Sequence, residues 1–106
     1  MKIVLQYFDG CPNWEITRRY LRTLVEEGME ATLDYELIDT QERAEERGFP
    51  GSPTVLIDGV DPFADGTLRP GLACRVYPTE KEWAGSPTLE QLREAIGARL
   101  GWEEER

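Results

Sequence analysis

The sequence predicts an α/β domain with the element order β-α-β-α-β-β-α and a four-stranded mixed sheet that has helices on both faces. Three observations lead to this class. Residues 3–8 are apolar apart from Gln6, which is typical of a central strand covered from both sides. A segment with helical apolar spacing follows it, and then a segment with period two. Strand, helix and strand form a crossover unit whose two strands are parallel.

The first predicted helix covers residues 12–27. Its apolar residues Tyr20, Leu21 and Leu24 recur at helical spacing, and Gly28 follows at the position where glycine often ends a helix. These features predict one apolar face that packs against the sheet.

Residues 31–38 alternate between apolar and polar side chains, which predicts a strand near an edge of the sheet. Asp39 and Glu42 then match a capping box for a short polar helix that ends near Gly48. The second helix is therefore expected to be mostly solvated.

The second half of the chain is expected to contain a hairpin with a long connection. Residues 54–57 and 72–77 are short apolar segments that predict strands, and residues 58–71 between them are rich in turn-forming residues. Asp58, Asp61 and Asp65 in this connection lack the spacing of a calcium loop, so they predict turns.

The closing helix begins at a second capping box, formed by Thr88 and Gln91. The chain of 106 residues is predicted to be a single domain. It divides into a βαβα half at 1–49, a ββα half at 50–101 and a frayed acidic tail at 102–106.

Composition excludes several classes of function. The formal net charge is −9, so we expect no nucleic-acid partner. No apolar run approaches the length of a membrane span, and the residues after Met1 do not resemble a secretory signal, so we expect a cytoplasmic protein that binds no membrane. The chain has no histidine, which excludes Cys-His and Ser-His catalysis and removes the commonest metal ligand. We predict no metal site.

Two local motifs lie beside predicted strands. Cys11 lies between the first strand and the first helix, within Phe8–Trp14, and Pro53 lies within Gly51–Thr54 just before a strand. With the element order, these motifs make the chain similar to the thioredoxin fold in its shorter, glutaredoxin-like form. The resemblance covers nearly the whole chain and implies a three-layer thioredoxin-like architecture.

The position of Cys11 suits thiol chemistry. The thiolate is the attacking form of cysteine, and the start of a helix stabilises negative charge through its unpaired N–H groups and dipole. Pro12 fits the first helical turn, where its missing N–H costs nothing. A loop position is also expected to leave Cys11 exposed.

The resemblance assigns further roles around this thiol. Pro53 would be a cis-proline that faces the cysteine, and Pro12, Trp14, Ser52, Pro53 and Thr54 would bind substrate. Trp14 stands where the family usually has its second cysteine, so a dithiol CxxC mechanism is replaced by a monothiol route. Cys11 would form a mixed disulfide with a protein or a small thiol, and glutathione as co-substrate or Cys74 would resolve it.

Several alternatives stay open. Cys74 is either this resolving thiol or a core residue, and Arg75 beside it is expected in a surface salt bridge. Loss of the second motif cysteine also fits a non-catalytic module that binds a protein partner. Alkylmercury lyases are similar in having two widely separated cysteines, but Trp14 replaces their aspartate, which leaves soft-metal binding by two thiolates. The oligomeric state is open.

Overall fold

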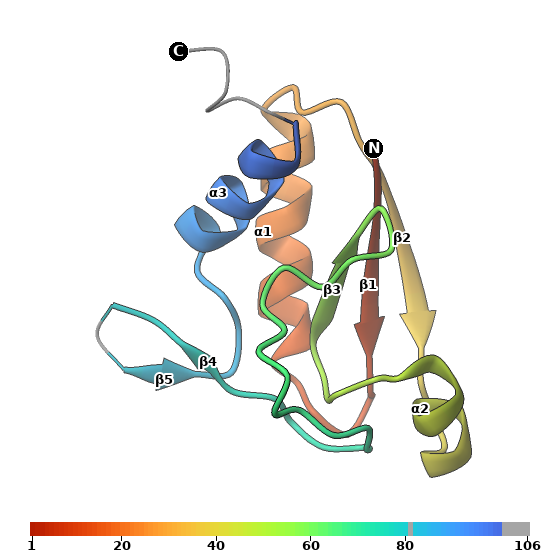
Figure 1. The fold of residues 1–106 in the computed structure, drawn as a ribbon. Helices are drawn as coiled ribbons and strands as arrows, with labels where there is room; N and C mark the ends of the chain where they lie inside the picture. Colours follow the sequence, from red (N-terminus) through yellow and green to blue (C-terminus); the bar gives the residue numbers. More distant parts are fainter. Residues whose placement is uncertain (81, 101–106) are drawn as a thin grey trace.

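The main sheet of the protein has three strands. A computed structural model describes residues 1–80 and 82–100, and it places β1 (Lys2–Tyr7) between β2 (Thr32–Leu37) and β3 (Thr54–Ile57) (Figure 1). β1 pairs with β2 in parallel and with β3 antiparallel. The predicted α/β class, central first strand and parallel crossover are therefore confirmed, and β2 lies at the sheet edge as predicted.

Helices α1 (Trp14–Glu26) and α3 (Leu89–Leu100) lie side by side against one face of this sheet (Figure 1). Their buried side chains and those of β1 and β3 form one core, which contains Ile3, Leu5, Leu21, Leu24, Val55, Ile57, Leu92 and Ile96. Gly28, with φ 102°, follows the end of α1 as predicted. This core holds the start of α1 at the end of β1.

The predicted capping boxes differ in outcome. At α3, Thr88 N donates to Gln91 Oε1 at 2.9 Å and Gln91 N donates to Thr88 Oγ1 at 3.0 Å, so this box is confirmed. At α2 (Gln41–Arg47), the cap is Thr40 and not Asp39: Thr40 has extended backbone, and its Oγ1 accepts from Arg43 N at 3.0 Å. A hydroxyl one residue later reaches the free N–H equally well.

The predicted four-stranded sheet is wrong. The chain turns back after β3 at Asp58 and Gly59, where both residues have positive φ, and Ile57 pairs with Val60. This pairing stops after one bridge because Pro62 follows closely and cannot donate to a ladder. Instead of a long hairpin, residues 58–71 form a connection that leads away from the sheet.

Residues 72–77 are not a strand beside β3, although they were predicted to be one. Ser52 N donates to Ala73 O at 2.8 Å and Arg75 N donates to Ser52 O at 2.9 Å, so the segment bonds to the loop that precedes β3. It enters a separate two-stranded sheet of β4 (Tyr77–Pro78) and β5 (Trp83–Ala84) (Figure 1). Three-layer packing with four strands is therefore not the architecture of this protein.

Helix α2 lies at one end of the sheet, where Ile38, Ala44 and Phe49 form a second small core (Figure 1). The expected coverage of both faces is thus replaced by two helices on one face and a short helix at the end. The predicted tail at 102–106 lies outside the described residues. Among the helices of residues 1–80 and 82–100, none has the length and apolar content needed to cross a membrane.

Acid should destabilise the protein partly through Glu36. Burial raises its pKa, but hydrogen bonds from Gln6 and Arg47 and the charges of Arg47 and Arg43 outweigh burial and hold the pKa below its usual range. A carboxylate with a lowered pKa contributes stability above its unfolded pKa and loses it as the pH falls. We expect Glu36→Gln to lose about 1 kcal/mol less stability than wild type between neutral pH and pH ~3.

Urea unfolding of both proteins at a series of pH values measures this difference. Equal acid dependence in the two proteins would contradict the role of Glu36.

Candidate functional site

Cys11 lies in the loop between β1 and α1, and it is fully buried. Its N–H donates to Phe8 O at 3.0 Å, which closes a tight turn at the end of β1. Asn13 is the N-cap of α1, so the sulfur stands just before a helix that begins two residues later than predicted. The expected exposure of Cys11 is wrong because Cys74 and the segment before β3 cover it.

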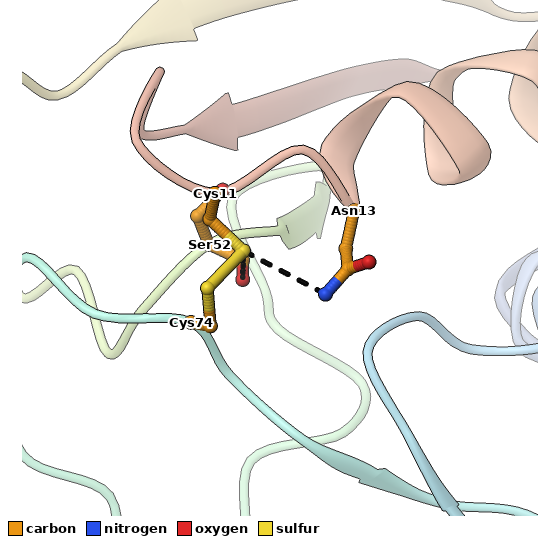
Figure 2. The surroundings of a disulfide bond; sticks show 4 residues. All are labelled: Cys11, Asn13, Ser52 and Cys74. Carbon is orange, nitrogen blue, oxygen red and sulfur yellow. Dashed lines mark hydrogen bonds between the residues drawn. A yellow bond between two sulfur atoms is a disulfide. The ribbon is translucent and has the colours of Figure 1, made fainter.

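Cys74 forms a disulfide with Cys11 across a sequence separation of 63, with the two Cα atoms 5.6 Å apart (Figure 2). This Cα separation lies inside the range of about 4.4–6.8 Å that disulfides usually span. Cys74 is exposed, so its interpretation as a core residue is wrong. The sequence left open whether Cys74 lies close enough to Cys11 to react with it, and the structure shows that it does. Cys74 is exposed and Cys11 is buried, so the two residues of the disulfide differ in burial.

The segment Gly51–Thr54 holds the two cysteines together. Ser52 forms a parallel bridge with Cys74, and its carbonyl oxygen lies 3.7 Å from Cys11 Sγ (Figure 2). Gly51 has φ 126°, and a Cβ there would lie 3.2 Å from Ala73 O, so glycine permits this close approach.

The residues expected to bind substrate through this segment are buried. The Ser52–Pro53 bond is cis, as the resemblance implied, and Pro53 O accepts from the Tyr77 hydroxyl. Thr54 Oγ1 donates to Gly51 O at 2.7 Å. Ser52 Oγ is buried with no hydrogen-bond partner in the described part of the chain. These three residues are therefore packed inside the fold in the segment that adjoins the disulfide.

The other two expected substrate residues differ in burial. Pro12 is exposed, whereas Trp14 is half-buried against the main core. The Trp14 ring packs on Tyr7 with centroids 4.3 Å apart and has the Arg18 guanidinium 5.3 Å from its centroid. The residue in the usual position of a second cysteine thus anchors α1.

Asn13 is a site residue that the sequence did not reveal. It makes no side-chain cap hydrogen bond to α1, and its Nδ2 instead points toward Cys11 Sγ at 3.7 Å (Figure 2). A Cβ on Gly85 would overlap the Asn13 amide, so Gly85 leaves room for the amide in this orientation. Asparagine is common at N-caps, and nothing in its spacing signals contact with the sulfur.

Arg75 was expected in a surface salt bridge, and this expectation is wrong because Arg75 is only 4% exposed. Its Nη1 donates to Asp61 Oδ2 at 2.7 Å and to Thr54 Oγ1 at 3.1 Å, and its Nη2 donates to Phe63 O at 3.0 Å. The guanidinium also lies 4.5 Å from the Tyr77 ring centroid. Arg75 therefore ties the 58–71 connection to the residue that follows Cys74.

Two aspartates of the 58–71 connection also form local hydrogen bonds with the backbone. Asp61 Oδ1 accepts from Phe63 N, and Asp65 Oδ1 accepts from Thr67 N, both at 2.9 Å, which are side-chain turns of the predicted kind. Within residues 1–80 and 82–100, no group of three or more Cys, Asp or Glu side chains is arranged to hold a metal ion.

A cleft of about 720 Å³ lies between α1, α3 and the β4–β5 hairpin. It is lined by both apolar and acidic side chains, among them Ile16, Tyr20, Glu82 and Glu94. Gly85 also lines it and lies against the Asn13 amide, so one wall of the cleft adjoins the side chain that points toward Cys11 Sγ.

Comparison with known proteins adds no assignment. No protein-family model matches the chain, and neither a curated protein nor a solved structure matches it.

Proposed function

We propose that this protein carries out thiol–disulfide exchange and that Cys11 and Cys74 are its reacting residues. The observation that carries the proposal is the pairing of two cysteines far apart in sequence, with one sulfur at the start of a helix and the other residue exposed. The exposed half of the bond gives an external thiol access, and the helix start favours the thiolate that leaves. The reductant is a small thiol such as glutathione, or a protein thiol.

The overall reaction balances with two external thiols. The first thiolate displaces one protein sulfur and forms a mixed disulfide, and the second displaces the other protein sulfur. The external thiols leave as one disulfide, and Cys11 and Cys74 become thiols after taking up the released protons. In the reverse direction the protein dithiol reduces an external disulfide.

Cys74 therefore replaces the second cysteine of the usual CxxC pair in this proposal. A relation to the thioredoxin-like proteins is supported by the strand–cysteine–helix junction at Cys11 and by Pro53 in the facing segment. A reducing compartment such as the cytoplasm would supply the thiols. The negative charge of the chain fits protein or small-molecule disulfides better than nucleic acid.

Turnover of a small disulfide by glutathione tests the proposal. We expect wild type to accelerate this exchange and Cys11→Ser or Cys74→Ser to lose about tenfold or more of the acceleration. Ala73→Ser is the matched control, because it adds a hydroxyl at an exposed position beside Cys74 and keeps both cysteines. An oxidised protein that glutathione does not reduce would reject the proposal in favour of a partner-binding module.

A second candidate function is the binding of a soft metal ion by both thiolates. The specific observation is that reduction would leave two sulfur ligands side by side, and within the described residues they belong to no group of three or more side chains that could hold a metal ion. Thiolates prefer soft ions. Titration of the reduced protein with Hg²⁺ is expected to reach one ion per chain and to weaken strongly in Cys74→Ser, and equal binding by that variant would contradict the paired site.

A further inference from the structure

The two cysteine residues of the disulfide differ in burial. Cys11 is fully buried beneath Cys74 and the segment that carries Ser52, while Cys74 is exposed. An attacking thiolate must approach a disulfide nearly in line with the S–S bond, from the side opposite the sulfur that leaves. Attack on Cys11 would therefore have to come through the buried surroundings of its loop, whereas we expect attack on Cys74 to come from solvent because this residue is exposed.

The surroundings of Cys11 also suit a leaving group. Asn13 Nδ2 carries N–H donors and lies 3.7 Å from Cys11 Sγ (Figure 2). This amide gives up the usual N-cap hydrogen bond, and Gly85 leaves the space that this orientation needs. The sulfur also stands at the positive end of α1, where a developing negative charge is stabilised. The carbonyl of Ser52, also 3.7 Å away, can accept a hydrogen bond from the Cys11 S–H once the thiolate is protonated.

We propose that an incoming thiolate attacks Cys74 Sγ and that Cys11 leaves as the thiolate beside the Asn13 amide. The electron pair of the attacking sulfur forms the new bond to Cys74, and the electron pair of the old bond goes to Cys11. The mixed disulfide is thus on Cys74, and Cys11 is the resolving residue in both directions of exchange. Asn13 is a positioning residue that acts through Cys11. This inference rests on the proposed exchange function and reverses the order expected from the sequence, in which Cys11 carries the mixed disulfide.

Single-cysteine variants test which sulfur receives the attack. Cys11→Ser retains only Cys74, and Cys74→Ser retains only Cys11, so both lack the disulfide and serve as controls for each other. We expect oxidised glutathione to modify Cys74 in the first variant at least about tenfold faster than Cys11 in the second. Circular dichroism checks that both are folded. Equal rates, or faster modification of Cys11, would overturn the inference.

A second measurement uses the wild-type protein and does not depend on how the variants fold. Oxidised protein is mixed with limiting glutathione, quenched with acid, alkylated at its free thiols and mapped by mass spectrometry. We expect glutathione on Cys74 and the alkyl group on Cys11. Glutathione on Cys11 would overturn this inference and leave the exchange function intact, whereas no reaction at either cysteine would reject both.

The role of Asn13 is tested separately. Asn13→Leu is expected to slow cleavage of the oxidised protein by glutathione several-fold, and Gly85→Ala is expected to do the same by displacing the amide. In the Cys74→Ser background, thiolate absorbance should appear at higher pH when Asn13 is replaced by leucine. Arg22→Gln, which removes an exposed charge from the same helix, is the control. An unchanged rate and an unchanged pH midpoint would remove Asn13 from the mechanism.

Discussion

Asp61→Ala is expected to lower the free energy of unfolding by about 3–5 kcal/mol, because it leaves a buried guanidinium without its carboxylate. The side chains of Arg75 and Asp61 are 3% and 13% exposed, and their charged atoms lie 2.7 Å apart. Asp61→Asn should cost roughly half as much, since the amide oxygen still accepts a hydrogen bond. Denaturant unfolding of both variants measures the difference.

The exposed pair of Arg93 and Glu27 provides the matched control. Its charged atoms lie 2.6 Å apart, closer than those of Arg75 and Asp61, but its side chains are 35% and 46% exposed. We expect no measurable change in stability for Glu27→Ala, because solvent screens exposed pairs. Similar losses in Asp61→Ala and Glu27→Ala would show that burial does not set the contribution of these pairs.

Reduction of the Cys11–Cys74 disulfide is expected to lower the free energy of unfolding by about 4 kcal/mol. The bond closes a loop over a sequence separation of 63, and a loop of this length removes much of the conformational freedom of the unfolded chain. Urea unfolding with and without a dithiol reductant measures the effect. By thermodynamic linkage, folding favours the disulfide over the dithiol by the same amount.

A variant with alanine at both cysteines separates this effect from any action of the reductant itself. Its stability should match that of the reduced wild type within about 1 kcal/mol and should not respond to the reductant. Unfolding curves of wild type that coincide in both redox states would contradict a stabilising disulfide.

The second half of the chain shows why part of the fold could not be predicted. Residues 72–77 have the apolar composition of a strand, yet Arg75 is buried and Cys74 is exposed. The partner of this segment is the loop around Ser52, and that choice depends on the Arg75–Asp61 pair and on the disulfide. Such contacts join residues far apart in sequence, so no local pattern contains them.

The candidate site also has features that the sequence predicts and features that it does not predict. Cys11 at a strand-to-helix junction and a proline segment before β3 follow from residue type and order, because each depends on neighbours in the chain. The burial of Cys11 does not, and neither does the orientation of Asn13. The burial of Cys11 depends on the segment around Ser52, which packs against it. The orientation of Asn13 depends on the space that Gly85 leaves for its amide.

Amino-acid sequence alone determined the α/β class, the three strands of the main sheet, the capping box of α3 and the cysteine at the start of α1. Tertiary structure decided which cysteine of the disulfide is exposed, where residues 72–77 lie and which charges are buried. The physical reason is range: helix periodicity, strand alternation and capping act over a few neighbouring residues. Burial and disulfide pairing, by contrast, are set by segments that meet only once the chain has packed.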